Sequence, residues 1–155
     1  IDRTLMRPRD VLKFLQYALE FAINHNHDKV HEEDIKQAEK IYSEDLLQNL
    51  VYEIKDVYPQ YPDLVYEFLG CSERITRNEL QNIFRKASVP QEKLDDVMDM
   101  LIWFGFLGVI DKQGNIRYSY QVQYATFKLG IRESNMFAIH PAFRLALECT
   151  ESMGR

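Results

Sequence analysis

The sequence has only two cysteines, Cys71 and Cys149, among 155 residues. Two cysteines are too few for the disulfide framework of a small secreted domain, so we expect a reducing, cytoplasmic location. Long apolar runs are also lacking, because the longest, residues 100–110, is interrupted by Gly105 and Gly108. A membrane span needs about 20 apolar residues, and no basic segment followed by an apolar stretch opens the chain. We therefore expect neither membrane association nor a secretory signal.

Motifs for nucleotide hydrolysis and other common enzyme chemistry are missing. None of the six glycines lies in a G-x-x-x-x-G-K-[ST] pattern, and G-x-S-x-G, H-E-x-x-H and C-x-x-C are absent too. We therefore expect no catalytic activity and no cofactor in this chain by itself. The chain begins with Ile rather than Met, which we interpret as a piece of a longer protein.

Positive charge is in short supply. The chain has 19 basic against 24 acidic side chains, a net charge of −5. This balance gives no general attraction to nucleic acid or to anionic membranes. Hydrophobic residues make up 46% of the chain, enough for a real core in one domain or two small ones.

The first part of the chain shows helical periodicity. Apolar side chains recur at a period near 3.6 over residues 8–25, and aromatic residues widen this stripe, so we expect a helix buried on two sides. The stripe consists of Leu12, Leu15, Leu19, Ala22 and Ile23, and the aromatic residues are Phe14, Tyr17 and Phe21. A second helix is predicted from Ile35 and a third up to Val57, with Ser43-Glu44-Asp45 as a possible interruption or restart. Pro59 and Pro62 end this region, and we place a domain boundary between residues 58 and 59.

The remainder, residues 59–155, changes to short elements. Helices are predicted over 63–69, 77–87 and 90–104, followed by strands over 107–111 and 116–122 that a turn at 112–115 connects. A further strand over 137–140 and a helix from Pro141 end the chain, and segment 123–136 is interpreted as a long wing or an inserted loop. The predicted fold is mainly α: a helical lid-type bundle, residues 1–58, followed by a winged-helix (α+β) domain, residues 59–155, with a small β-hairpin wing.

The start of the first helix carries two arginines. Pro8 suits the first helical position and Asp10 suits the first turn, but Arg7 and Arg9 are cations beside the positive end of the helix dipole. Solvated arginines at a surface helix are one interpretation. A phosphate site is the other, since helix N-termini bind anions readily.

Three histidines lie close together as His25-x-His27-x3-His31, with Asp28 between them. This composition favours a solvated turn between two helices. Zinc or nickel binding is the alternative, because imidazole and carboxylate groups are ligands for both ions.

A winged helix normally indicates DNA binding through its third helix. Here the helix predicted over 90–104 is acidic on its exposed face, with Glu92, Asp95, Asp96 and Asp99, and phosphates would repel it. We therefore favour protein contact over DNA. Basic residues of this half that could form an off-centre patch, or serve only as solubilising charge, are Arg74, Arg77, Arg85, Lys86 and Arg117.

Three segments of the first half resemble a known family. Residues 7–15 (R-P-R-D-V-L-x-F-L), 30–38 (V-H-E-E-D-I-x-x-A) and 42–47 (Y-S-E-D-L-L) are similar to the helical lid of AAA+-type P-loop ATPases. The origin-recognition and STAND-like branches, including bacterial ATPases of unassigned role, are the most similar. In these branches the lid leads into a winged helix.

The resemblance implies a function through parts outside this chain. An arginine at the start of the lid helix, the sensor-2 position, reaches the terminal phosphate of the nucleotide in this family, and that role would belong to Arg9, with Arg7 as the neighbouring candidate. ATP and Mg²⁺ would be bound by an upstream ATPase core of the same chain. The winged helix would dock a protein partner or a neighbouring subunit. A DNA-binding module and a free-standing structural adaptor are the alternatives.

Overall fold

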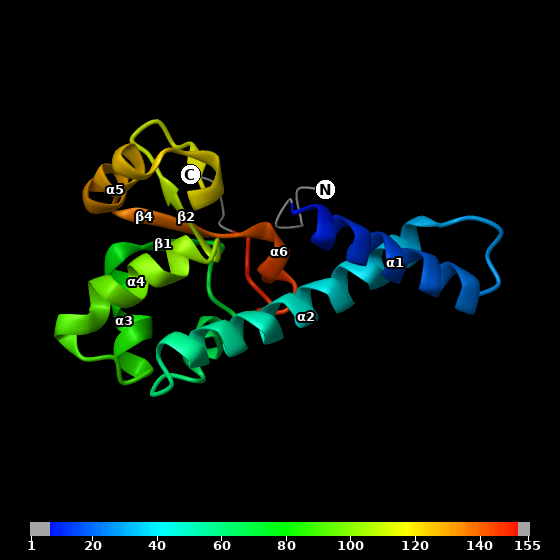
Figure 1. Ribbon diagram of the computed structural model, residues 1–155, viewed down its shortest axis with the longest axis horizontal. Coiled ribbons are helices and arrows are strands. Elements are labelled where there is room, and N and C mark those ends of the chain that lie inside the picture. Colours follow the sequence, from blue (N-terminus) through cyan, green and yellow to red (C-terminus); the bar gives the residue numbers. More distant parts are fainter. Residues whose placement is uncertain (1–6, 152–155) are drawn as a thin grey trace.

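The computed structural model describes residues 7–151 (Figure 1). Two long helices, α1 (Pro8–Asn24) and α2 (Glu32–Val57), pack together as an antiparallel hairpin whose connecting loop lies far from the rest of the molecule. Shorter elements follow, and they form a four-stranded antiparallel sheet with its helices. The elements are η1 (Leu64–Phe68), β1 (Arg74–Thr76), α3 (Arg77–Lys86), η2 (Gln91–Lys93), α4 (Leu94–Trp103), β2 (Leu107–Ile110), β3 (Ile116–Arg117), η3 (Ser119–Gln121), α5 (Tyr124–Glu133), β4 (Met136–Ile139) and α6 (Pro141–Arg144). A mainly α chain with a small α+β part is confirmed.

Helix α1 is present as predicted, but the expectation that its leucine stripe is buried is wrong. Leu12, Leu15, Leu19 and Ile23 are between 51% and 71% exposed. Instead α1 packs on α2, where Ala18 and Ala22 are buried and the three aromatic residues are half-buried. Alanines leave room for the two helix backbones to approach, and the leucines and Ile23 lie on the opposite, exposed side of α1. We call the four exposed residues the leucine face.

Helix α2 runs without a break, so the interruption considered at residues 43–45 does not occur. Ser43 is buried, and its hydroxyl accepts a hydrogen bond of 3.0 Å from the backbone N–H of Ala146, just after α6. The serine therefore ties the helix to the end of the chain rather than starting a new helix.

The second half of α2 contributes to the core of the sheet region. Leu50 and Ile54 lie in the same hydrophobic core as Leu64, Phe68 and Phe143. The loop after Val57 is where the domain boundary was predicted, and that boundary stays a prediction. Within residues 7–151, none of the helices is long and apolar enough to cross a membrane.

The sheet has the order β1-β4-β2-β3 and differs in part from the expected hairpin. Strand β4, predicted at residues 137–140, lies between β1 and β2 and pairs antiparallel with both. Strand β1 was not predicted, and β3 is much shorter than the strand predicted over 116–122. Segment 123–136 is neither a loop nor a wing alone, because it contains α5. The chain leaves the sheet after β3 because Tyr118 is buried there, with its ring 4.6 Å from that of His140.

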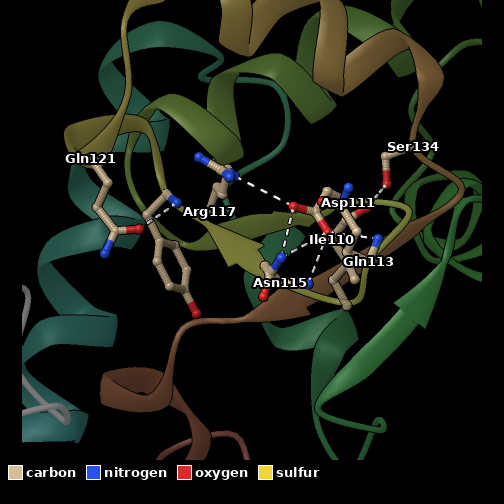
Figure 2. A network of polar contacts seen from close by, with 8 residues as sticks. Ile110, Asp111, Gln113, Asn115, Arg117, Gln121 and Ser134 are labelled. Atoms are coloured by element: carbon tan, nitrogen blue, oxygen red, sulfur yellow. Dashed lines mark hydrogen bonds and ion pairs between the residues drawn. The ribbon is translucent and has the colours of Figure 1, made fainter.

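The hairpin turn between β2 and β3 is confirmed at residues 112–115 (Figure 2). The Oδ1 atom of Asp111 accepts hydrogen bonds from the backbone N–H groups of Gln113 and Asn115, each at 2.9 Å. The hydrogen bond from Asn115 is the main reason why the pKa of Asp111 lies below its usual value. Gly108 on β2 permits the close approach of β3, since a Cβ there would lie only 2.7 Å from Ile116 Cγ2.

Candidate functional site

A cleft of about 460 Å³ opens beside the start of α1. It is bounded by the first turns of α1, by α2, and by two aromatic residues of the sheet region. Its lining residues are Arg7, Arg9, Asp10, Lys13, Leu46, Asn49, Leu50, Tyr52, Glu53, Phe104 and Phe143. Both arginines singled out in the sequence therefore line one cleft, at the junction of the hairpin with the rest of the molecule.

The local sequence determines how this cleft begins. Arg7 is the extended N-cap of α1, and Pro8 occupies the first turn without the loss of a hydrogen bond. The backbone carbonyl of Arg7 accepts from the N–H of Asp10 at 2.9 Å. Arg7 and Arg9 are both exposed, so their guanidinium groups are available to an anion next to the helix N-terminus.

Lys13 adds a third cation to the cleft, one helical turn after Arg9. Its Nζ lies 2.9 Å from Asp45 Oδ2 on α2, and this hydrogen bond raises the pKa of Lys13. Tyr17 donates to the same carboxylate and is the main reason for the lowered pKa of Asp45. Because Lys13 is paired with Asp45, binding of an anion would rely mainly on Arg7 and Arg9.

The cleft also contains an unusual carboxylate. Asp10 is buried, and its Oδ2 has no hydrogen-bond partner among the described residues. Lys13, Asn49 and Glu53 also line this cleft, and no sequence pattern indicated them. The i, i+4 spacing of Arg9 and Lys13 could have indicated that they share one face of α1. The residues of α2 reach the cleft only because α2 packs against α1, which the sequence does not show.

The histidines gather differently from the sequence pattern. His25, His27 and Asp34 have ligand atoms that all lie within 4.8 Å of one another. His31 stands outside this group: its ring stacks on that of His27 at 4.3 Å, and it faces Asp28 at 3.7 Å. The carboxylate of the cluster thus comes from α2 and not from Asp28 in the loop.

Arg77, a candidate nucleic-acid contact, has a structural role. Its Nη2 donates to the carbonyls of Ile131 at 2.5 Å and Ser134 at 2.9 Å, at the C-terminal end of α5. The guanidinium also lies 5.3 Å from the ring centroid of Phe137. A cation at the C-terminal end of a helix donates hydrogen bonds to its last carbonyls and interacts favourably with the negative end of the helix dipole.

The other four basic candidates do not form one patch. Arg74 lies on β1 and Arg117 on β3, at opposite edges of the sheet. Arg74 and Lys86 line a hollow of about 280 Å³, whereas Arg85 hydrogen-bonds with Asn82 at 2.9 Å. Across the region from η2 into α4, Glu92, Asp95 and Asp96 are exposed and Asp99 is half-buried, with a pKa that burial raises.

Comparison with known proteins gives a family match for the hairpin. Residues 1–51 match a family described as the FunZ-associated C-terminal helical domain. This match covers the first third of the chain, including α1 and most of α2. The hairpin is therefore similar to a helical domain that occurs at the C-terminal end of larger proteins.

One curated relative matches over nearly the whole chain. The "Putative transposon gamma-delta 80.3 kDa protein" of Escherichia coli (strain K12) is 25% identical over an alignment 158 residues long. That alignment includes 93% of this chain. The same alignment covers 22% of that protein, so the chain spans about a fifth of the length of its relative. No solved structure matches the chain.

Proposed function

We propose that this chain is the C-terminal regulatory region of a P-loop ATPase, in which the α1–α2 hairpin is the lid over a nucleotide. The observation that carries this proposal is the shared cleft of Arg7 and Arg9 at the exposed N-terminus of α1. A phosphate between these arginines would offset their repulsion from the helix dipole. In this proposal Arg9 contacts the terminal phosphate, and Arg7 supports it.

The nucleotide and its Mg²⁺ would be bound by an ATPase core in the same polypeptide. Two observations support a larger protein: the family match is to a C-terminal domain, and the chain corresponds to 22% of its curated relative. The leucine face of α1 supplies the surface for that core. Four large apolar side chains along one exposed helix face are typical of an interaction surface, and we assign this one to the core.

The sheet region would transmit closure of the lid to a partner protein or a neighbouring subunit. Its exposed acidic residues Glu92, Asp95 and Asp96 suit a basic protein surface and oppose a phosphate backbone. The core that α2 shares with this region gives the movement a physical route, because a shift of the hairpin would displace Leu50 and Ile54 within it.

Substitution of Arg9 tests the nucleotide half of the proposal. In the full-length protein, we expect Arg9→Ala to lower the rate of ATP hydrolysis by about 10²–10³-fold, the usual loss on removing one charge-stabilising donor. The fold should be unchanged, since Arg9 is exposed. Steady-state phosphate release measures the rate, and circular dichroism checks the fold.

Arg132→Ala is the matched control, because Arg132 is an exposed helical arginine on α5, outside the cleft. Its hydrolysis rate should equal that of the unsubstituted protein. Equal rates for Arg9→Ala and Arg132→Ala would exclude the sensor role. Binding of ATP to these 155 residues alone at millimolar affinity or tighter would also contradict the proposal, since the phosphate-binding core would then be unnecessary.

A gel-shift titration against duplex DNA tests the docking half. We expect no binding at low salt, because the exposed acidic face repels phosphates. DNA binding that weakens with salt, and that the double substitution Arg74→Glu/Lys86→Glu abolishes, would favour a DNA-binding module instead. Arg77 is unsuitable for this test, since its substitution would disturb the end of α5.

A further inference from the structure

We propose that the loop between α1 and α2 binds one first-row divalent transition-metal ion, with His25, His27 and Asp34 as its protein ligands. One ligand atom from each residue lies within 4.8 Å of the other two. Two imidazoles and one carboxylate form a donor set that zinc and nickel accept. The site is independent of the proposed lid function.

The end of α1 fixes the positions of both histidines. Asn26 adopts a left-handed conformation with φ 55°. Its N–H donates to the carbonyl of Ile23 at 3.0 Å, and the N–H of His27 donates to that of Ala22 at 2.9 Å. This pair of hydrogen bonds is the Schellman ending of a helix, which places the residues on either side of Asn26 in a defined geometry. His25 and His27 are therefore positioned by the backbone, not by a metal.

The start of α2 supplies the third ligand. Asp34 is fully buried in the first turn. Its Oδ2 accepts from the backbone N–H of His31 at 2.9 Å and lies 2.8 Å from His27 Nδ1. These two bonds lock the orientation of the carboxylate. Helix capping thus holds one oxygen and directs the other toward the histidines.

The second carboxylate oxygen of Asp34, Oδ1, supports the presence of a bound ion. Oδ1 is buried and has no hydrogen-bond partner among the described residues, and His25 Nδ1 lies 3.5 Å away from it. A buried, unsatisfied carboxylate oxygen is costly, and an ion is one of the few things that explains it.

The surrounding charges also favour a cation. The C-terminal end of α1 carries the negative end of the helix dipole, and its last turn has no basic residue. The first turn of α2 is acidic, with Glu32 and Glu33 beside Asp34. These groups offset the positive dipole end of α2, which would otherwise oppose a metal ion.

The geometry suits bond lengths to a transition metal. Ligand atoms around tetrahedral zinc are about 3.3 Å apart, as follows from metal–ligand bonds of about 2.0–2.1 Å. The separation of 3.5 Å between His25 Nδ1 and Asp34 Oδ1 is close to this value, and the ligand atoms of all three residues lie within 4.8 Å of one another. His25 is exposed and His27 is half-buried, so an ion can enter from solvent without opening the hairpin.

Calorimetric titration of the chain with zinc chloride tests the site. We expect one ion per chain with micromolar affinity or tighter, and at least tenfold weaker binding for His25→Gln, which removes an exposed ligand without disturbing the core. His31→Gln is the matched control, because it removes an imidazole of the same loop that lies outside the cluster. The control should bind zinc as the unsubstituted chain does.

Asp34→Asn separates a built site from chance chelation by surface histidines. We expect it to abolish tight zinc binding. Circular dichroism shows whether the Asp34→Asn variant is folded, and the His25→Gln variant tests the same site without a change in the core. Absence of heat in the unsubstituted chain would overturn the proposal. Equal losses for His25→Gln and His31→Gln would overturn it as well, since binding would then follow the histidine-rich loop rather than the cluster with Asp34.

Discussion

Replacement of Phe106 by alanine should lower the free energy of unfolding by about 3–5 kcal/mol, the range measured for buried phenylalanines. Phe106 precedes β2 and is fully buried. Its ring makes edge-to-face contacts with Phe68 of η1 at 5.0 Å and with Phe143 of α6 at 5.1 Å. One side chain therefore joins three segments that are distant in the sequence, and its removal leaves a cavity that none of them can fill alone.

Urea denaturation followed by circular dichroism measures this effect. Leu129→Ala on α5 is the control, because Leu129 is 61% exposed and a surface substitution of this kind changes stability by about 0.5 kcal/mol or less. A loss below about 1 kcal/mol for Phe106→Ala would mean that the three aromatic rings do not share a tightly packed core.

The starts of α1 and α3 could be predicted from the sequence because their signals are local, whereas α5 was missed and α2 was predicted as two helices. The Thr76–Glu79 capping box starts α3 as expected: the N–H of Glu79 donates to Thr76 Oγ1 at 3.2 Å, and the N–H of Thr76 donates to Glu79 Oε2 at 2.8 Å. Pro8 likewise begins α1. Such patterns involve residues three or four positions apart, so no tertiary contact is needed to recognise them.

Strand β1 and the true extent of β3 could not be predicted in this way. β1 has only three residues, and its pairing with β4 joins Ile75 to Phe137, which lies in another part of the chain. The alternating residues after Ile116 satisfy the pattern of a strand, but Tyr118 turns into the core and ends it. The stability of a short strand depends on its pairing with a neighbouring strand, and the sequence does not indicate which strand that is.

Exposure of the leucine face shows a second limit. Periodicity in α1 predicts one broad apolar stripe, with Leu12, Leu15, Leu19, Ala22 and Ile23 widened by aromatic residues, but it does not say which part of that stripe packs on α2. Hydrophobicity alone favours the leucines, whereas the structure buries Ala18 and Ala22. The choice follows from how closely the two backbones approach, which is a property of the pair of helices.

The candidate sites also differ in whether their signals are local in the sequence or depend on tertiary packing. Arg7 and Arg9 could be selected because helix start signals and charge are both local. The grouping of His25 and His27 with Asp34 depends on how α1 ends and α2 begins, and the spacing of the histidines alone suggested His31 instead. The role of Arg77 at the end of α5 had no signal, since its partners Ile131 and Ser134 lie more than 50 residues away in the chain.

Stability should fall on acidification because of His140. The residue is buried at the start of α6, where its Nδ1 accepts a hydrogen bond of 3.1 Å from the N–H of Ala142. Protonation would place a hydrogen on Nδ1, facing the Ala142 N–H, and this acceptor would be lost. Burial, and next the charge of Arg144, lower the pKa of His140 from 6.5 to about 4. The folded protein thus holds the imidazole neutral where the unfolded chain would protonate it.

The direction of the effect follows from proton linkage. Between about pH 6.5 and about pH 4 the unfolded chain binds the extra proton, so the contribution of His140 is fully present above 6.5 and is lost as the pH falls toward 4. A pKa difference of this size corresponds to about 3 kcal/mol in the free energy of unfolding.

Urea denaturation at a series of pH values measures this free energy. The control is His140→Asn, since asparagine can still cap α6 but does not titrate. The variant should lose the His140 part of the pH dependence. An unchanged profile in His140→Asn would show that other groups cause the acid sensitivity.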